Sequence, residues 1–123
     1  MCIRDRRQPH RAGWSLPGGL LDRGEGPQAG VERELREETG LVVEVGLPVV
    51  TQVNAALRRV DVVYRVRVGT RPRVVPGGEA TAAAWLRPEE VVADADGPTR
   101  EILAVLARAS APGGHDGRVL AEP

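Results

Sequence analysis

Residues 19–41 read as a glycine-rich loop, a short helix crowded with carboxylates, and a glycine that ends the helix. Pro27 suits a first helical position, because the N–H that proline lacks would have no partner there. Gly40 stands where a residue in the left-handed conformation closes a helix, and Leu41 follows it. These local signals predict a helix between Pro27 and Gly40.

Three acidic side chains are expected on one face of this helix, because residues three and four positions apart are neighbours. They are Glu34, Glu37 and Glu38. Like charges at this spacing repel one another. The face is therefore either a solvated charged surface or a site for a hard divalent cation such as Mg²⁺ or Mn²⁺, which prefers oxygen ligands. Arg33 lies one turn before Glu37, close enough to hold that carboxylate.

The complete spacing favours the cation site. From Gly19 the pattern continues with Glu25 and then, after seven further residues, with the run RELREETGL, which ends at Leu41. This pattern resembles the Nudix box and is complete at each of its defining positions. The run WSLPGG at residues 14–19 resembles the usual lead-in to that box. By this resemblance the chain is identified as a member of the Nudix hydrolase family.

The resemblance implies an α/β fold, a Nudix-like α/β/α sandwich around a mixed β-sheet, as one domain over residues 1–110. Residues 1–11 are polar and basic without strand-like alternation. We therefore expect them to be disordered, the domain to be truncated at its N-terminus, and the sheet to lack its N-terminal strand. Residues 111–123 have few core residues and are expected to form a disordered tail.

Alternation of apolar and polar residues places the other elements. We expect strands over residues 41–45, 49–53, 59–68 and 82–86, and helices over residues 88–92 and 98–109.

The resemblance also implies a role for each charged residue of the box. Cleavage of a diphosphate needs the phosphate charge neutralised and water activated, and bound divalent ions do both. Glu34 and Glu38 would be the main metal ligands, and Glu37 would complete the cluster or hold a metal-bound water. Arg33 would fix Glu37 by a charge-assisted hydrogen bond, whereas Glu25 would be a structural partner of the helix.

Two positions outside the helix are further candidates by resemblance. The carbonyl of Gly18 would be an additional metal ligand, although an ordinary turn explains this glycine equally well. Family members often carry an acid ahead of a tryptophan, as an additional metal ligand or the general base. Glu79 is the one candidate before Trp85, with a surface glutamate as the rival interpretation. Tyr64 is either a ligand contact or a surface residue of the sheet.

Composition limits the classes of partner. Seventeen basic residues, all arginine, balance seventeen acids, so charge does not favour a nucleic-acid scaffold or a membrane surface. The single cysteine, Cys2, excludes an internal disulfide and fits a reducing, cytoplasmic location. We expect a nucleotide-type small molecule as partner and no membrane, with a homodimer left open.

The sequence therefore predicts a metal-dependent hydrolase that cleaves the diphosphate bond of nucleoside diphosphates linked to another moiety. ADP-ribose-like compounds, nucleoside triphosphates and dinucleoside polyphosphates remain open as substrates. Two rival interpretations are a catalytically silent Nudix-fold nucleotide-binding or regulatory module and a plain structural α/β domain with an acidic helix.

Overall fold

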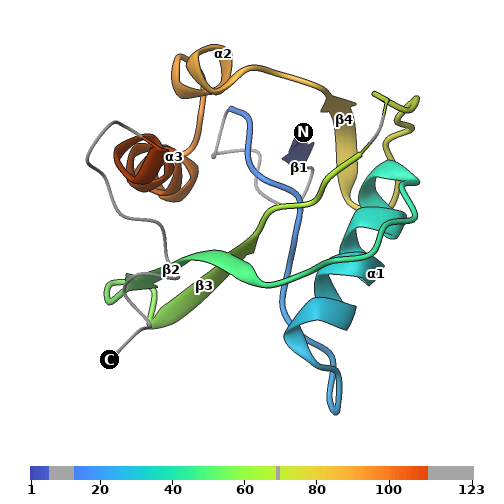
Figure 1. Cartoon of the computed structure of the whole chain (residues 1–123), viewed down its shortest axis with the longest axis horizontal. Helices are drawn as coiled ribbons and strands as arrows, with labels where there is room; N and C mark the ends of the chain where they lie inside the picture. The colour runs from blue at the N-terminus through green and yellow to red at the C-terminus, as the bar shows by residue number, and fades with distance from the viewer. Residues whose placement is uncertain (6–12, 69, 111–123) are drawn as a thin grey trace.

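The computed structural model describes residues 1–5, 13–68 and 70–110 of the 123-residue chain. Its elements, in chain order, are β1 (Cys2–Asp5), α1 (Pro27–Thr39), β2 (Pro48–Asn54), β3 (Arg59–Tyr64), β4 (Ala80–Ala84), α2 (Pro88–Val92) and α3 (Gly97–Ser110). The strands lie between α1 on one side and α3 on the other (Figure 1). Helix α1 contacts β4, and α3 contacts β2. This layering agrees with the α/β/α arrangement expected from the sequence.

The paired strands form two antiparallel ribbons. Strand β1 pairs with β4, with Ile3 opposite Ala83. Strand β2 pairs with β3, with Val53 opposite Val60. The α/β class is thus confirmed, but within the described residues the sheet pairing is two antiparallel pairs rather than the single mixed sheet that we expected.

The N-terminal residues correct one expectation. Residues 1–11 were expected to be disordered, and the sheet to lack its first strand, yet Cys2–Asp5 form β1. The N–H of Ile3 donates to the carbonyl of Ser15 at 2.8 Å, and the N–H of Ser15 donates back to Ile3 at 2.9 Å. Four residues are too few for alternation to reveal a strand in the sequence. Residues 6–11 and the expected tail at 111–123 lie outside the described part of the chain.

The segment after α1 corrects a second expectation. Residues 41–45 were expected to form a strand but carry none. The N–H of Val45 donates to Oε1 of Glu32 at 2.9 Å, and the side-chain amide of Gln28 donates to the carbonyl of Gly46 at 2.5 Å. Side chains of α1 thus bond backbone groups at the end of this segment that an adjacent strand would otherwise pair.

The remaining elements agree with the sequence prediction to within a few residues. Helices α2 and α3 lie where residues 88–92 and 98–109 were expected to be helical, and β2 and β4 overlap their predicted strands. Strand β3 ends at Tyr64 rather than at residue 68. Within the described residues, no helix is long and apolar enough to cross a membrane.

A small apolar core joins the N-terminal strand to the C-terminal helices. Cys2 and Val91 are each 2% exposed and form this core together with Ala95. Trp14, in the segment that precedes the glycine turn, packs against the same cluster. Its backbone N–H donates to the carbonyl of Asp94 at 2.6 Å. The core and this hydrogen bond together fix the course of the chain that leads into residues 18–19.

Candidate active site

The helix signals of the sequence position the carboxylates. Helix α1 begins with Pro27 and ends at Gly40, which has φ 76° and donates its N–H to the carbonyl of Arg36 at 3.0 Å. Leu35 is buried and anchors one face of the helix in the protein. Glu34 and Glu38 lie beside that face of the helix. Their side chains point toward residues 18 and 19, which precede the helix in the chain.

The three carboxylates differ in their burial. Glu38 is 7% exposed as a residue, and the side chain of Glu34 is 16% exposed, whereas that of Glu37 is 50% exposed. Burying a carboxylate is costly unless it has hydrogen-bond or charge partners. Glu38 and Glu34 therefore need partners within the protein.

The glycine turn meets both of these acids. The N–H of Gly18 donates to Oε2 of Glu38 at 3.1 Å. A Cβ atom on Gly19 would lie 2.5 Å from Oε1 of Glu34, so only a glycine lets the backbone approach that carboxylate without displacing it. Gly18 has φ 154°, within the region that favours glycine. The structure thus places the turn of residues 18–19 against Glu34 and Glu38, with the N–H of Gly18, rather than its carbonyl, in contact with a carboxylate.

Arg33 joins the loop before the helix to the acids on it. Its Nε donates to Oε2 of Glu25 at 2.7 Å and its Nη2 donates to Oε1 at 3.0 Å, which is a bidentate pair. Its Nη1 donates to Oε1 of Glu34 and to Oε2 of Glu37, both at 3.1 Å. The contact expected between Arg33 and Glu37 is therefore present, and Glu25, expected to be a structural partner of the helix, contacts the helix through Arg33.

These contacts shift the pKa values of the central pair. The hydrogen bonds from Arg33, followed by the backbone hydrogen bond from Asp22, lower the pKa of Glu25 to about 2. The hydrogen bonds to Glu25 in turn raise the pKa of Arg33. A fourth carboxylate, that of Asp22, lies 3.2 Å from Nε of Arg33. Arg33 is thus a permanent cation that fixes the loop of residues 20–25 against α1.

A second loop closes the other end of α1. The N–H of Gly77 donates to the carbonyl of Glu38 at 3.1 Å, and the N–H of Val75 donates to that of Thr39 at 3.0 Å. A Cβ atom on Gly77 would lie 2.6 Å from the carbonyl oxygen of Glu37. Glu79 is half-buried and follows this contact by two residues. The backbone of the loop therefore brings Glu79 to the end of the helix that carries the acids.

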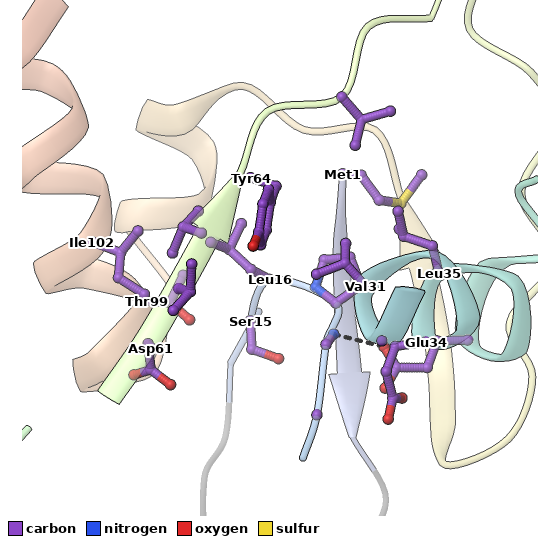
Figure 2. Close-up of a pocket in the computed structure, with 18 of the residues that line it drawn as sticks. Met1, Ser15, Leu16, Val31, Glu34, Leu35, Asp61, Tyr64, Thr99 and Ile102 are labelled. Carbon is purple, nitrogen blue, oxygen red and sulfur yellow. Dashed lines mark hydrogen bonds between the residues drawn. The ribbon is translucent and has the colours of Figure 1, made fainter. Parts of the chain in front are cut away.

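The carboxylates line one end of a cleft of about 1150 Å³. Figure 2 shows Glu34 and Val31 of α1 at one end, Asp61 and Thr99 at the other, and Tyr64 between them. Tyr64 is thus a residue of the cleft wall. Sequence reasoning missed Asp61 and Thr99, because nothing local in β3 or α3 marks a residue that only tertiary packing brings to the cleft.

The donor set suits a hard divalent cation, since carboxylate oxygens are the ligands that Mg²⁺ and Mn²⁺ prefer. Among the described residues, however, no three acidic, histidine or cysteine side chains are gathered as a ready-made metal site. Arg33 engages one oxygen each of Glu34 and Glu37, which leaves the second oxygens of these groups available. The residues fit such an ion by their chemistry, without being assembled around one point.

Comparisons with known proteins identify the family of the chain. The family model described as the NUDIX domain matches residues 2–106. A MutT-like protein of Streptomyces ambofaciens is 40% identical over 86 residues, which cover 69% of this chain and 54% of that protein. The chain therefore spans about half the length of this curated relative.

Two solved structures share the fold. One is a protein of Chromobacterium violaceum assigned to the nudix hydrolase family, with a TM-score of 0.67 and 24% identity, covering 98% of this chain and 75% of that one. The other is the MutT protein of Methanosarcina mazei Go1, with a TM-score of 0.65 and 21% identity, covering 90% and 85%. At these identities the likeness concerns the fold alone.

Proposed function

The chain belongs to the NUDIX domain family, and we propose from its site that it is a divalent-metal-dependent hydrolase of the diphosphate bond in nucleotide derivatives. One observation carries the proposal: buried Glu38 accepts a hydrogen bond from Gly18 in a cleft that Glu34, one helical turn away, also lines. A plain structural helix has no need of two acids held against a glycine turn.

The roles that we propose follow from burial and contacts. Glu34 and Glu38 would hold Mg²⁺ or Mn²⁺, with Glu37 and the Gly18 carbonyl as further oxygen ligands. The ion would supply charge neutralisation at the phosphates and a more acidic water. Arg33 is a positioning residue, because its Nη1 fixes one oxygen of Glu34 and one of Glu37.

The proton of the attacking water needs an acceptor near the phosphates. Glu38 and Glu79 are the candidates, since Glu38 lines the cleft and the loop before Glu79 is bonded to the end of α1. A positioned general base contributes about 10²- to 10⁴-fold to a rate. We propose that one of these two glutamates takes the proton as the water attacks phosphorus.

The test is a screen for phosphate or diphosphate release from nucleoside triphosphates and from nucleoside diphosphates linked to a second group, with Mg²⁺ and with Mn²⁺. We expect turnover that Glu38→Gln lowers by about 100-fold or more. Glu101→Gln, which alters an exposed acid of α3 outside the cleft, is the matched control and should retain full activity.

A chain that binds nucleotide without turnover would instead be a binding or regulatory module. Glu38→Gln with undiminished turnover would contradict the role given to this residue. We also propose that the protein is cytoplasmic, which cell fractionation tests. Whether it forms a homodimer is left open, and the molar mass in solution measures it.

A further inference from the structure

The segment that follows β3 is unusually basic. Residues 65–78 contain four arginines and no acidic residue, in a chain whose formal net charge is zero. The four are Arg65, Arg67, Arg71 and Arg73, and all are exposed. We call them the arginine strip. A chain with balanced overall charge has thus gathered a local excess of cations on one segment.

Other arginines of the cleft are already neutralised. Arg33 is shared among the acids around it. Arg59 pairs with Asp61, its Nε lying 2.9 Å from Oδ1 and its Nη2 donating to Oδ2 at 3.1 Å. Within residues 1–5, 13–68 and 70–110, by contrast, no ion pair engages any member of the arginine strip. The strip therefore presents cations that are free to meet an external anion.

The strip starts at the cleft. Arg65 lines the same cleft as the acids of α1. Arg65 and Arg67 are exposed while Val66 and Val68 are half-buried, so the two arginines lie on one side of the segment. In an extended chain, side chains two residues apart are about 7 Å from each other. The first pair thus forms two adjacent positive points, of which Arg65 lines the cleft and Arg67 follows it on the same side of the segment.

The second pair is held near the end of the acidic helix. Pro72 lies between Arg71 and Arg73 in the sequence. Its carbonyl accepts a hydrogen bond from the indole N–H of Trp85 at 2.9 Å. The N–H of Val75 donates to α1 two residues further on. In Figure 1 the chain runs from β3 toward the end of α1. The strip therefore leads from the cleft to the helix that carries the acids.

Arginine is suited to phosphate, because its planar guanidinium donates two parallel hydrogen bonds to phosphate oxygens. The acids of α1 repel phosphates unless cations lie between them, so they do not attract further phosphates of a substrate. We propose that the arginine strip binds the phosphates beyond the pair that is cleaved. The preferred substrate is then a nucleotide with a chain of three or more phosphates, rather than a nucleoside diphosphate joined to a neutral group.

This inference rests on the proposed function, and its first test does not require turnover. Isothermal titration calorimetry with inorganic tripolyphosphate, without metal, compares the wild-type chain with the double variants Arg65→Ala/Arg67→Ala and Arg71→Ala/Arg73→Ala. We expect each double variant to bind about tenfold more weakly, and wild-type binding to weaken with salt. Arg108→Ala, an exposed arginine of α3 outside the cleft, should bind like the wild type.

Kinetics form the second test and separate the two sources of a long phosphate chain. The ratio kcat/KM should fall in the double variants for a nucleoside triphosphate and for a dinucleoside polyphosphate, and stay within about twofold for a nucleoside diphosphate sugar. A larger fall in kcat/KM for the nucleoside triphosphate or for the dinucleoside polyphosphate identifies which of the two supplies the phosphate chain.

Equal tripolyphosphate binding by the wild type and both double variants would overturn the inference, and so would equal losses on all three substrates. A chain without turnover whose tripolyphosphate binding still depends on the strip would refute the hydrolase alone. If Glu38→Gln still binds tripolyphosphate but no longer turns over substrate, the result supports both the hydrolase and the phosphate-binding role of the arginine strip.

Discussion

The N–H of Gly18 donates to Oε2 of Glu38 at 3.1 Å, which joins two residues that are twenty positions apart in the chain. The bond gives a nearly buried carboxylate a partner and fixes the direction of one of its oxygens. It also ties the turn at residues 18–19 to the last turn of α1, so the loop and the helix form one unit.

Gly19→Ala should lower activity while leaving the fold intact. The added Cβ would lie 2.5 Å from Oε1 of Glu34, so the end of this side chain must turn away and give up its hydrogen bond from Arg33. We expect the free energy of unfolding to change by less than about 0.5 kcal/mol and kcat/KM to fall by about 10- to 100-fold, because a displaced catalytic group is expensive. Gly46→Ala, where a Cβ meets nothing within 4 Å, is the control; equal activity of the two variants would contradict the expectation.

Gly77→Ala should have the opposite profile and lower stability. Its Cβ would lie 2.6 Å from the carbonyl oxygen of Glu37, which belongs to the helix backbone and cannot rotate away. We expect a loss of about 1–3 kcal/mol in the free energy of unfolding. Urea denaturation measures it, again with Gly46→Ala as the control. A midpoint unchanged from the wild type would show that the loop of residues 75–78 shifts freely.

The pair between Glu25 and Arg33 should make stability depend on pH. The pKa of Glu25 is about 2 in the folded chain, against 4.5 for the free side chain, so the folded state binds its proton less readily. The stabilisation is therefore fully present above pH 4.5 and is lost as the pH falls toward 2. The difference in unfolding free energy between the wild type and Glu25→Gln should shrink over this range in urea titrations. If this difference in unfolding free energy stays constant from pH 7 to pH 2, the pair of Glu25 and Arg33 does not cause it.

Arg58→Gly should stabilise the chain. Arg58 ends the turn between β2 and β3 with φ 52°, the one non-glycine residue at positive φ in the described ranges. The left-handed conformation costs a residue with a side chain about 1–2 kcal/mol, part of which glycine loses again in conformational entropy. We expect a gain of about 0.5–1 kcal/mol, read as a higher Tm. Arg58→Val should lower the Tm, and a Tm lowered by both variants would contradict this account.

Divalent ions should stabilise the fold through the carboxylates. A ligand at ten times its Kd adds about 1.4 kcal/mol to the free energy of unfolding, so millimolar Mg²⁺ or Mn²⁺ should raise the Tm and EDTA should reverse the effect. Glu34→Gln should reduce this response, and Glu101→Gln should keep it. A Tm indifferent to both ions would favour the plain structural domain.

The parts of the molecule that could be predicted are those that local chemistry decides. Pro27 and Gly40 mark the ends of α1, as their backbone preferences require. The contact between Arg33 and Glu37 follows from a spacing of one helical turn. These features depend on residues a few positions apart, so their geometry is contained in the sequence pattern.

What the sequence could not show depends on distant partners. Val45 belongs to a run with strand-like alternation, but the carboxylate of Glu32 takes its N–H. Strand β1 is defined by its pairing with residues far away in the sequence, since Ile3 lies between Ala83 and Ser15. Thr99 reaches the cleft because α3 packs where it does. In each case a contact across the fold, rather than a local preference, decides the outcome.

Two hydrogen bonds, from Trp85 to Pro72 and from Val75 to Thr39, hold the loop after β3 at separate points. Both use backbone carbonyls as acceptors, so they survive most changes of side chain at Arg71 and Arg73. Mutation can therefore alter the charge of this loop while the acids of α1 keep their places. Descendants of this chain could acquire new substrates by exchanging a few surface residues, without rebuilding the part that performs the chemistry.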